Sequence, residues 1–391
     1  MQAANAINEE LARARSELRE VCDVAVISWP AHVTYVSGFD VPPGFGVVEA
    51  TAYAPPFAVI SVNDTSSWLA ASVIEAPAAR ERSRLPHLLT FDAFDSFKPA
   101  DPQATYLDAL ITALNETGLW RAGTVGVEGR ALPAAAAEAI TSAFPVAKLV
   151  DIHEALVRAR LIKTGREIDL LRHIAEIAAV GQRTLANLVQ RPGQNEIDMW
   201  NSVIDEMSKA AGRQLPVVGE IVSGDRTATV APGGPADRVA QEGDPILMDI
   251  SQRLNGYWSD CTNSHLVGGG EPSPTVKQLA RAAQSAFEAG FEKLRPGSKA
   301  SDVWLAAESA YRRHGMEPPH YMGHQLGTTV NELPRLAQYD HTPIQAGMVF
   351  AVEPGAYELT GGRVGVRFEK IMLVTSSGPE ILTHFDWGIA V

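Results

Sequence analysis

The chain has 391 residues, of which 46% are hydrophobic and 20% charged, and a formal net charge of −13 at pH 7. This length exceeds one ordinary hydrophobic core and predicts two domains. The negative charge argues against nucleic acid or an anionic membrane as a partner, because phosphates and lipid headgroups carry the same sign.

The beginning of the chain carries no visible targeting segment. Residues 1–10 lack both the basic region and the apolar region of a secretory signal. No stretch reaches the roughly 18 apolar residues that a membrane-spanning helix needs. The two cysteines, Cys22 and Cys261, lie far apart and form no disulfide framework, so we expect a cytoplasmic protein.

Strand-like and helix-like segments alternate at first, which predicts an α/β domain over residues 1–155. The expected helices are residues 6–21, 106–117 and 132–144, and the expected strands are residues 23–28, 33–39, 57–62 and the neighbourhood of 126–127. The proline- and glycine-rich residues 41–46 indicate a loop. With Trp29, His32 and Tyr35 nearby, this loop could reach an active site, although ordinary packing is an alternative role for each of these residues.

A second domain, residues 156–391, is predicted to open with a long helix. Thr164 and Glu167 have the spacing of a capping box, in which each side chain bonds the other residue's backbone N–H. Apolar residues then recur at helical intervals and predict an amphipathic helix over about residues 165–190. These residues are Leu171, Ile174, Ala178, Leu185 and Leu188.

The second domain also contains an internal repeat. Residues 191–212 and 295–315 share a pattern of turn and helix residues, and the second copy begins 104 residues after the first. A chance pair of turns before helices is the alternative. A real repeat fits a pseudo-symmetric sheet wrapped by helices. The matched residues are Arg191-Pro192-Gly193, Asp198, Trp200 and Gly212 in one copy and Arg295-Pro296-Gly297, Asp302, Trp304 and Gly315 in the other.

Two carboxylates stand in one strand-turn-strand stretch. Residues 246–251 carry Asp249, a polar turn follows, and residues 256–262 carry Asp260, which predicts two adjacent strands. Neighbouring carboxylates in apolar surroundings repel each other unless a proton or a cation neutralises them. We favour a bound cation over the alternative, a surface hairpin with two solvated acids.

Three further ionisable residues lie in short apolar segments of the C-terminal half. His324 ends the sequence HYMGH, Glu353 lies in FAVEPG, and Glu369 ends VGVRFE. Charged groups seldom occupy such positions without a partner.

The order of these five residues, with their local sequences, resembles that of the pita-bread metallopeptidases, which include Xaa-Pro aminopeptidases, prolidases and methionine aminopeptidases. All five metal-ligand positions of that family are matched. The first part of the chain is similar to the N-terminal domain of creatinase and Xaa-Pro aminopeptidase. The resemblance implies an α+β protein, with a creatinase-type α/β N-terminal domain before a pita-bread catalytic domain. It also implies a homodimer, in which the N-terminal domain often reaches the active site of the partner.

The resemblance further implies two divalent metal ions. Asp260 and Glu369 would bridge the ions, Asp249 would hold one of them, and His324 with Glu353 would complete the other. This oxygen-rich ligand set favours Mn²⁺, with Co²⁺, Fe²⁺ or Zn²⁺ as alternatives. The implied chemistry is hydrolysis of an amide by a metal-activated water, with Glu353 also acting as a proton shuttle.

The expected substrate contacts depart from the family pattern. Neutral His320 matches a family histidine and is expected to hydrogen-bond the substrate carbonyl, or else to cap a turn beside Pro318. Xaa-Pro-cleaving members carry a histidine in the loop before the first ligand, but here residues 174–264 contain none. Asn331 replaces a second family histidine. Arg226 of the altered loop is expected either to pair with a substrate carboxylate or to be solvated.

Two more departures lie beside the predicted ligands. His265 stands where the family usually has an apolar or aromatic residue, and we expect it to be structural. Lys370 stands where the family usually has an acid, which changes the surroundings of Glu369 or only the outer face of the strand.

The leading hypothesis is a dinuclear metal-dependent hydrolase that cleaves a C–N bond in a small amide, a modified amino acid or a short peptide. The missing histidines favour a small amide over a general Xaa-Pro peptide. The alternatives are an Xaa-Pro dipeptidase or aminopeptidase, a non-hydrolytic lyase on the same fold, and a pseudoenzyme that only binds. Retention of all five ligands argues against the pseudoenzyme, because a metal-free cluster of acids is costly to hold together.

Overall fold

The computed structural model describes residues 8–41, 55–118, 123–231, 233–358 and 364–391. The chain divides into two compact units, residues 1–161 and 162–391. The boundary predicted at residue 155 falls inside helix α7 (His153–Arg160), which belongs to the first unit. Most of the loop predicted at residues 41–46 lies outside the described residues.

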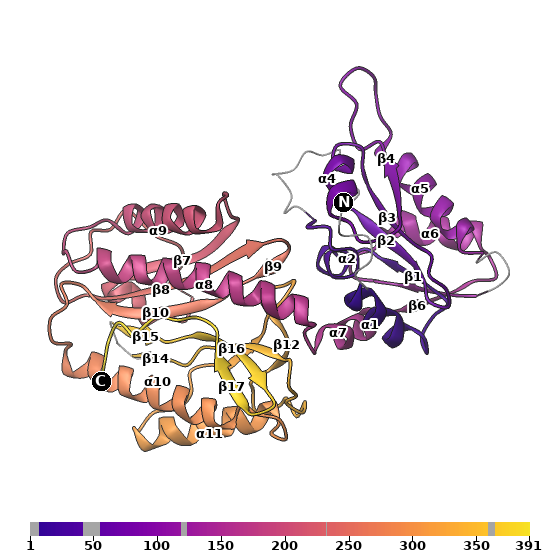
Figure 1. The fold of residues 1–391 in the computed structure, drawn as a ribbon. Helices are drawn as coiled ribbons and strands as arrows, with labels where there is room; N and C mark the ends of the chain where they lie inside the picture. Colours follow the sequence, from indigo (N-terminus) through magenta and orange to yellow (C-terminus); the bar gives the residue numbers. More distant parts are fainter. Residues whose placement is uncertain (1–7, 42–54, 119–122, 232, 359–363) are drawn as a thin grey trace. The chain divides into compact units, whose positions relative to one another are not determined.

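The first unit is built around a six-stranded mixed sheet with the strand order β4-β3-β2-β1-β5-β6 (Figure 1). β1 runs antiparallel to β2 and parallel to β5. Successive residues of β1 point to opposite faces, so Ala25 and Ile27 join one apolar cluster while Val24 and Val26 join another. The strands are β1 (Val24–Ile27), β2 (Phe57–Ser61), β3 (Ser67–Ser72), β4 (His87–Phe91), β5 (Thr124–Val127) and β6 (Lys148–Asp151).

Helices cover both faces of this sheet. Residues of α1, α2, α4 and α7 enter the first apolar cluster, and residues of α5 and α6 enter the second. The helices predicted at residues 6–21, 106–117 and 132–144 are confirmed as α1, α5 and α6. α5 begins before its predicted start, because the Asp101 side chain accepts the Ala104 N–H and Pro102 fits the first turn. The helices are α1 (Glu9–Leu18), α2 (Pro30–Ser37), α4 (Ala76–Arg82), α5 (Pro102–Glu116), α6 (Ala134–Ala143) and α7.

The strand predicted at residues 33–39 is wrong, because most of this segment belongs to α2. Pro30 suits the first turn of a helix, where its missing N–H is not needed. Gly38 ends the helix in a left-handed conformation, with φ at 72°, and donates its N–H to Thr34 O. Seven of the eight helical residues are buried, so the run is apolar on all sides and shows no helical period.

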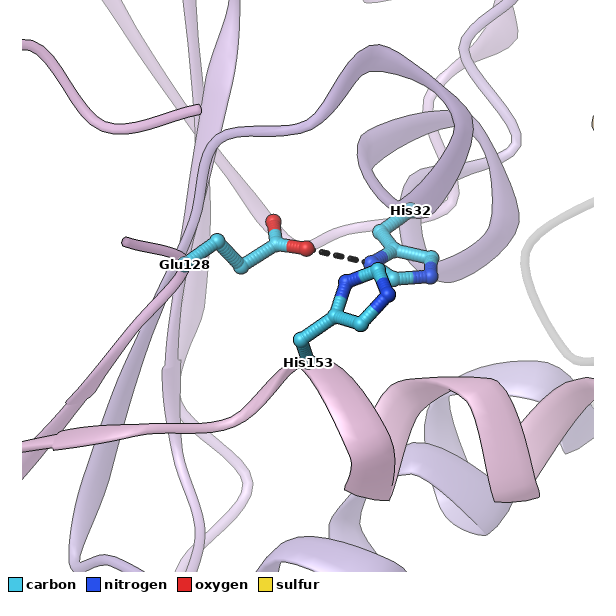
Figure 2. A group of neighbouring side chains, drawn as sticks. All are labelled: His32, Glu128 and His153. Carbon is cyan, nitrogen blue, oxygen red and sulfur yellow. Dashed lines mark hydrogen bonds and ion pairs between the residues drawn. The ribbon is translucent and has the colours of Figure 1, made fainter. Parts of the chain in front are cut away.

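Figure 2 shows Glu128, just beyond β5, beside His32 of α2 and His153 of α7. One carboxylate oxygen of Glu128 accepts the N–H groups of Ser28 and Trp29, each at 2.8 Å, and the other is hydrogen-bonded to His32 Nδ1. Burial lowers the pKa of His32, so its ring is neutral at pH 7. The donor set is one that metals use, but both oxygens of Glu128 already fasten the start of α2 to the sheet.

The second unit contains three groups of strands. Their orders are β10-β8-β7, with β9 paired to β8, then β12-β11-β13-β16-β17, and β14-β15. Figure 1 shows these strands lying between the helix pair α8 and α9 and the helix pair α10 and α11. The helices are α8 (Gly165–Leu188), α9 (Glu196–Ala211), α10 (Pro274–Lys293) and α11 (Ala300–Arg313). The strands are β7 (Val217–Ser223), β8 (Pro245–Leu254), β9 (Tyr257–Trp258), β10 (Cys261–Leu266), β11 (Gly323–Gln325), β12 (Glu332–Arg335), β13 (Val349–Val352), β14 (Gly355–Tyr357), β15 (Gly365–Arg367), β16 (Lys370–Thr375) and β17 (Gly378–Ile381).

The helix predicted over residues 165–190 is confirmed as α8. Both hydrogen bonds of the capping box between Thr164 and Glu167 are present. The predicted apolar face packs in the main core of the unit through Leu171, Ile174 and Leu185. This core also takes in residues of β8, so α8 supports the strand that carries Asp249.

The internal repeat reappears in the pairing of the backbone. Asn195 forms an isolated bridge with Val239, and Lys299 forms one with Pro343. Both partners of the second bridge therefore follow those of the first by 104 residues. In each copy a helix, α9 or α11, begins at the next residue.

The same offset relates Gly219 of β7 to Gly323 of β11. Each has a positive φ, and an added Cβ would come within 2.2 Å or 2.0 Å, respectively, of a backbone oxygen of the neighbouring strand. Glycine therefore permits a close strand approach at both places. The residues that follow, Glu220 and His324, hold matching positions in the two halves.

Among the described helices, none combines the length and the apolar composition that a membrane crossing requires.

Candidate metal centre

Asp249 lies in β8 and Asp260 directly precedes the neighbouring strand β10, so the two adjacent strands predicted from the sequence are confirmed. β8 and β10 pair antiparallel with Asp249 opposite Thr262. Between them Asn255 and Gly256 form a two-residue turn into β9 with φ values of 49° and 84°, which suits an Asn-Gly hairpin turn. The Ser251 hydroxyl, two residues after Asp249 on the same face, donates to Asp260 Oδ1 at 2.8 Å.

The second half of the unit brings His324, Glu353 and Glu369 to the same place. β11 carries His324, β13 ends just before Glu353, and β16 begins just after Glu369. β13 pairs with both of the other strands. The Glu369 N–H donates to Thr262 O at 2.8 Å and so joins this sheet to β10.

The functional groups of these residues converge. His324 Nε2 lies 3.5 Å from Asp260 Oδ2 and 3.5 Å from Glu353 Oε1. The potential ligand atoms of Asp260, His324 and Glu369 all lie within 4.8 Å of one another. The structure thus assembles a buried cluster of acids around one imidazole.

Other groups orient the donors toward the centre of the cluster. His324 Nδ1 donates to Gln325 O at 2.9 Å, which leaves Nε2 facing the acids. Arg367 donates to Asp249 at 2.6 Å, and Thr262 donates to Glu369 Oε2 at 2.7 Å. The remaining oxygens Glu353 Oε1 and Glu369 Oε1 are buried without a hydrogen-bond partner.

The electrostatics of the cluster call for positive charge. Burial, followed by repulsion from neighbouring acids, raises the pKa of Asp249 and Glu369, and it raises that of Glu353 to about 7. Burial alone would lower the pKa of His324, but the hydrogen bond to Asp260 and the nearby acids outweigh it and raise the pKa to about 9. A divalent cation would supply this charge without a proton. Unpartnered oxygens and hard donors therefore fit a metal site.

A cavity of about 460 Å³ opens onto the cluster. Its lining includes Asp249, Asp260 and Glu353, together with His320. Burial lowers the pKa of His320 to about 4, so the ring is neutral. Its Nδ1 donates to Tyr321 O at 2.7 Å, which leaves Nε2 buried, unpartnered and without a proton. In this tautomer Nε2 is an acceptor, whereas we had predicted a hydrogen bond from His320 to the substrate carbonyl. A contact between His320 and substrate stays a prediction.

The two residues predicted to contact substrate do not line this cavity. Arg226 is hydrogen-bonded to Glu196 and donates to Gly234 O at 2.6 Å. Asn331 donates to the Tyr321 hydroxyl at 3.0 Å. Both side chains hold loops around the cavity, and their contact with substrate stays a prediction.

Two residues that the sequence analysis missed do line it. Arg367 is buried and donates from Nη2 to Asp249 at 2.6 Å and to Glu220 at 2.7 Å. An arginine within an otherwise apolar run, two residues before Glu369, was a signal that the sequence offered. Glu220 precedes His324 by 104 residues, so the repeat could have pointed to it.

Comparison with known proteins gives matches over both units. Residues 169–376 match metallopeptidase family M24, and residues 11–162 match the creatinase/prolidase N-terminal domain. An Xaa-Pro dipeptidase of Pyrococcus furiosus is 26% identical over 372 residues, which cover 93% of this chain and 94% of that protein. A putative dipeptidase of Bacillus subtilis is 29% identical over 263 residues, which cover 67% and 71%.

Solved structures match over nearly the whole chain. The prolidase from Pyrococcus horikoshii has a TM-score of 0.79 at 24% identity, with 97% of this chain and 99% of that chain covered. The Xaa-Pro dipeptidase from Bacillus anthracis has a TM-score of 0.79 at 23% identity, with 97% and 98% covered. These likenesses confirm the predicted fold, a creatinase-type α/β domain followed by a pita-bread domain.

Proposed function

Because the chain belongs to metallopeptidase family M24, we propose that it is a metal-dependent hydrolase of a C–N bond in a small amide, a modified amino acid or a short peptide. The observation that carries this proposal is the pair of buried, unpartnered oxygens of Glu353 and Glu369 beside His324. Such oxygens are costly to bury unless a cation occupies the space between them.

Five side chains would hold two divalent ions, with Mn²⁺ as the first choice and Co²⁺, Fe²⁺ or Zn²⁺ as alternatives. Asp260 and Glu369 would be shared between the ions. Asp249 would complete one set, and His324 with Glu353 the other. The bonds from Arg367, Ser251 and Thr262 leave one oxygen of each aspartate and of Glu369 directed inward.

The bound ions would lower the pKa of a water molecule and polarise the substrate carbonyl. Glu353 is placed to take the proton of that water and return it to the leaving nitrogen, because its Oε1 has no other partner. His320 Nε2 would accept the N–H of the substrate and so fix its orientation in the cavity.

The substrate-side wall favours a small amide. In Xaa-Pro-cleaving members of the family that this chain resembles, one loop carries a histidine. Here the same loop contributes Val230, Ala231, Gly233 and Gly234 to the cavity lining. This wall offers substrate no imidazole. An Xaa-Pro dipeptidase is the second candidate, and it is supported by the names of the relatives, which cover 93% and 97% of this chain. A lyase on the same fold is a third.

The proposal is tested by incubating Mn²⁺-loaded protein with N-acyl amino acids, small cyclic amides and Xaa-Pro dipeptides. Uptake of one oxygen from labelled water into product is expected, together with loss of turnover in Glu353→Gln. Rapid release of proline would favour the dipeptidase instead. An alkene product without label would show elimination and overturn the hydrolase. The homodimer and the cytoplasmic location stay predictions.

A further inference from the structure

A second cavity of the C-terminal unit, of about 1120 Å³, lies apart from the metal-centre cavity. It is lined by residues of α8, β10 and α10 and by the segment 380–388. His265 and Lys370 both belong to its wall, although they are far apart in sequence. Neighbouring residues on a strand point to opposite faces, so Lys370 and Glu369 look to opposite sides of the sheet. We call this the rear cavity.

The rear cavity has an aromatic wall. Phe287 and Phe291 come from α10, and Phe385 and Trp387 come from the C-terminal segment. Ring centroids of Phe287 and Trp387 are 5.1 Å apart, and those of Phe385 and Trp387 are 6.0 Å apart. Such a wall suits an apolar group of a ligand.

Two buried side chains of this wall each have a polar atom without a hydrogen-bond partner, His265 Nε2 and Gln182 Oε1. His265 is 3% exposed, and no described residue forms a hydrogen bond with its ring. Gln182 is fully buried, and its amide nitrogen donates to Met248 O at 3.3 Å and to Cys261 O at 3.0 Å. The Gln182 Oε1 accepts no hydrogen bond. An acceptor that is buried without a hydrogen bond is costly, and a bound donor would remove that cost.

Lys370 adds an amine at the aromatic wall, and burial lowers its pKa to about 7, so the group is only partly charged at neutral pH. Its side chain is 4% exposed, and Nζ lies 3.0 Å from the ring centre of Phe385 and 4.4 Å from that of Trp387. Nζ donates to Phe385 O, but no described acid forms a salt bridge with it. Asp386, exposed at the rim, lines the same cavity. The wall therefore combines an amine without an ion-pair partner, which a bound carboxylate would favour in its ammonium form, with an unused amide oxygen and a carboxylate.

We propose that the rear cavity binds a small apolar α-amino acid. The carboxylate of the ligand would pair with Lys370, and its ammonium group would donate to His265 Nε2, Gln182 Oε1 or Asp386. Its side chain would pack on the aromatic rings. Binding does not depend on the proposed function. One consequence does rest on the proposed function. If hydrolysis releases an amino acid, its binding beside Lys370 would affect the metal centre through the adjacent Glu369, which amounts to product feedback.

The test is calorimetric titration of L-phenylalanine and L-leucine into the full chain, both loaded with Mn²⁺ and treated with EDTA. One site per chain is expected in both states. Phenylalaninamide, which lacks the carboxylate, and 3-phenylpropionate, which lacks the ammonium group, should each bind at least about tenfold more weakly. Lys370→Met should weaken L-phenylalanine binding by about tenfold or more. Lys293→Met, at an exposed position of α10, is the matched control and should bind as the unaltered chain does.

His265→Phe, which keeps a ring at the position, provides a second variant and should weaken binding at an unchanged melting temperature. The proposal is overturned if neither amino acid binds at millimolar concentration, or if Lys370→Met and His265→Phe bind as the unaltered chain does. It is also overturned if binding requires Mn²⁺ and competes with an amide substrate, because the ligand would then occupy the metal-centre cavity. If the protein fails to hydrolyse any amide but binds the amino acid in calorimetry, the proposed function fails and the rear-cavity proposal stands.

Discussion

Removing divalent ions should make the protein lose stability as the pH rises toward neutrality. Burial raises the pKa of Asp249, Glu353 and Glu369 in the metal-free fold. A carboxyl group with a raised pKa contributes stability that is present below its unfolded pKa and is lost as the pH rises through its folded pKa. For Glu353 this window runs from the ordinary value of 4.5 to about 7.

Glu353 alone sets a measurable magnitude. Its pKa rises from 4.5 to about 7, and each unit corresponds to roughly 1.4 kcal/mol, so the metal-free protein loses roughly 3 kcal/mol of unfolding free energy across the window. At roughly 2–4 °C per kcal/mol for a unit of this size, the melting temperature falls by roughly 6–12 °C. Ions that bind only the folded chain should abolish this fall.

The assay is scanning calorimetry between about pH 5 and pH 8, with EDTA and with Mn²⁺. The metal-free melting temperature should fall with pH, and Mn²⁺ should remove most of the fall. Glu353→Gln should reduce the slope of the metal-free protein, whereas Glu292→Gln, at an exposed position of α10, should keep it. Equal slopes with and without Mn²⁺ would refute the reasoning that these acids share a cation.

Three further changes test individual side chains. Arg367→Lys should lower Mn²⁺ affinity in calorimetric titration by about tenfold to a hundredfold, because one ammonium cannot replace the guanidinium that joins Asp249 to Glu220; unchanged affinity would contradict this. His320→Phe should raise KM by about tenfold without changing Mn²⁺ content, because substrate loses a hydrogen-bond acceptor; unaltered KM would remove His320 from the site. His265→Phe should lessen acid sensitivity. Burial lowers the pKa of His265 to about 4, so only the unfolded chain gains a proton there between pH 7 and pH 5. This difference lowers the unfolding free energy of the unaltered protein by about 2 kcal/mol over that range. If urea titration gives an equal loss of unfolding free energy in the variant, His265 is not the origin of the acid sensitivity.

The main features of the second unit could be predicted from sequence because each has a local signal. The capping box at Thr164 and the apolar face of α8 both lie within one helix, and the structure contains them. The turn between Asp249 and Asp260 is also local, since only 10 residues separate the two acids. The proximity of His324 to these two acids was inferred only from the family resemblance, because the residues around His324 in the sequence do not indicate a contact with β10.

Other features depend on contacts that no local pattern records. α2 was mistaken for a strand because a fully buried helix has no polar face to reveal its period. Arg367 spans Asp249 and Glu220, which come from two other strands. The tautomer of His320 is decided by the carbonyl of Tyr321, and the sequence alone suggested the opposite hydrogen bond. His265 and Lys370 appeared as separate oddities, and only the fold places them in one wall.

The duplicated halves of the second unit bear on its history. Asp249 and Asp260 come from one half, and the other three candidate ligands come from the second. A half-length ancestor that paired with its own copy would have presented two equal donor sets across a dyad. Fusion of two such copies would have freed the matching positions 220 and 324 to differ, and they now hold a carboxylate and an imidazole. An ion seated between the halves would then serve as a clasp, and a chelator should open the seam between them to proteases.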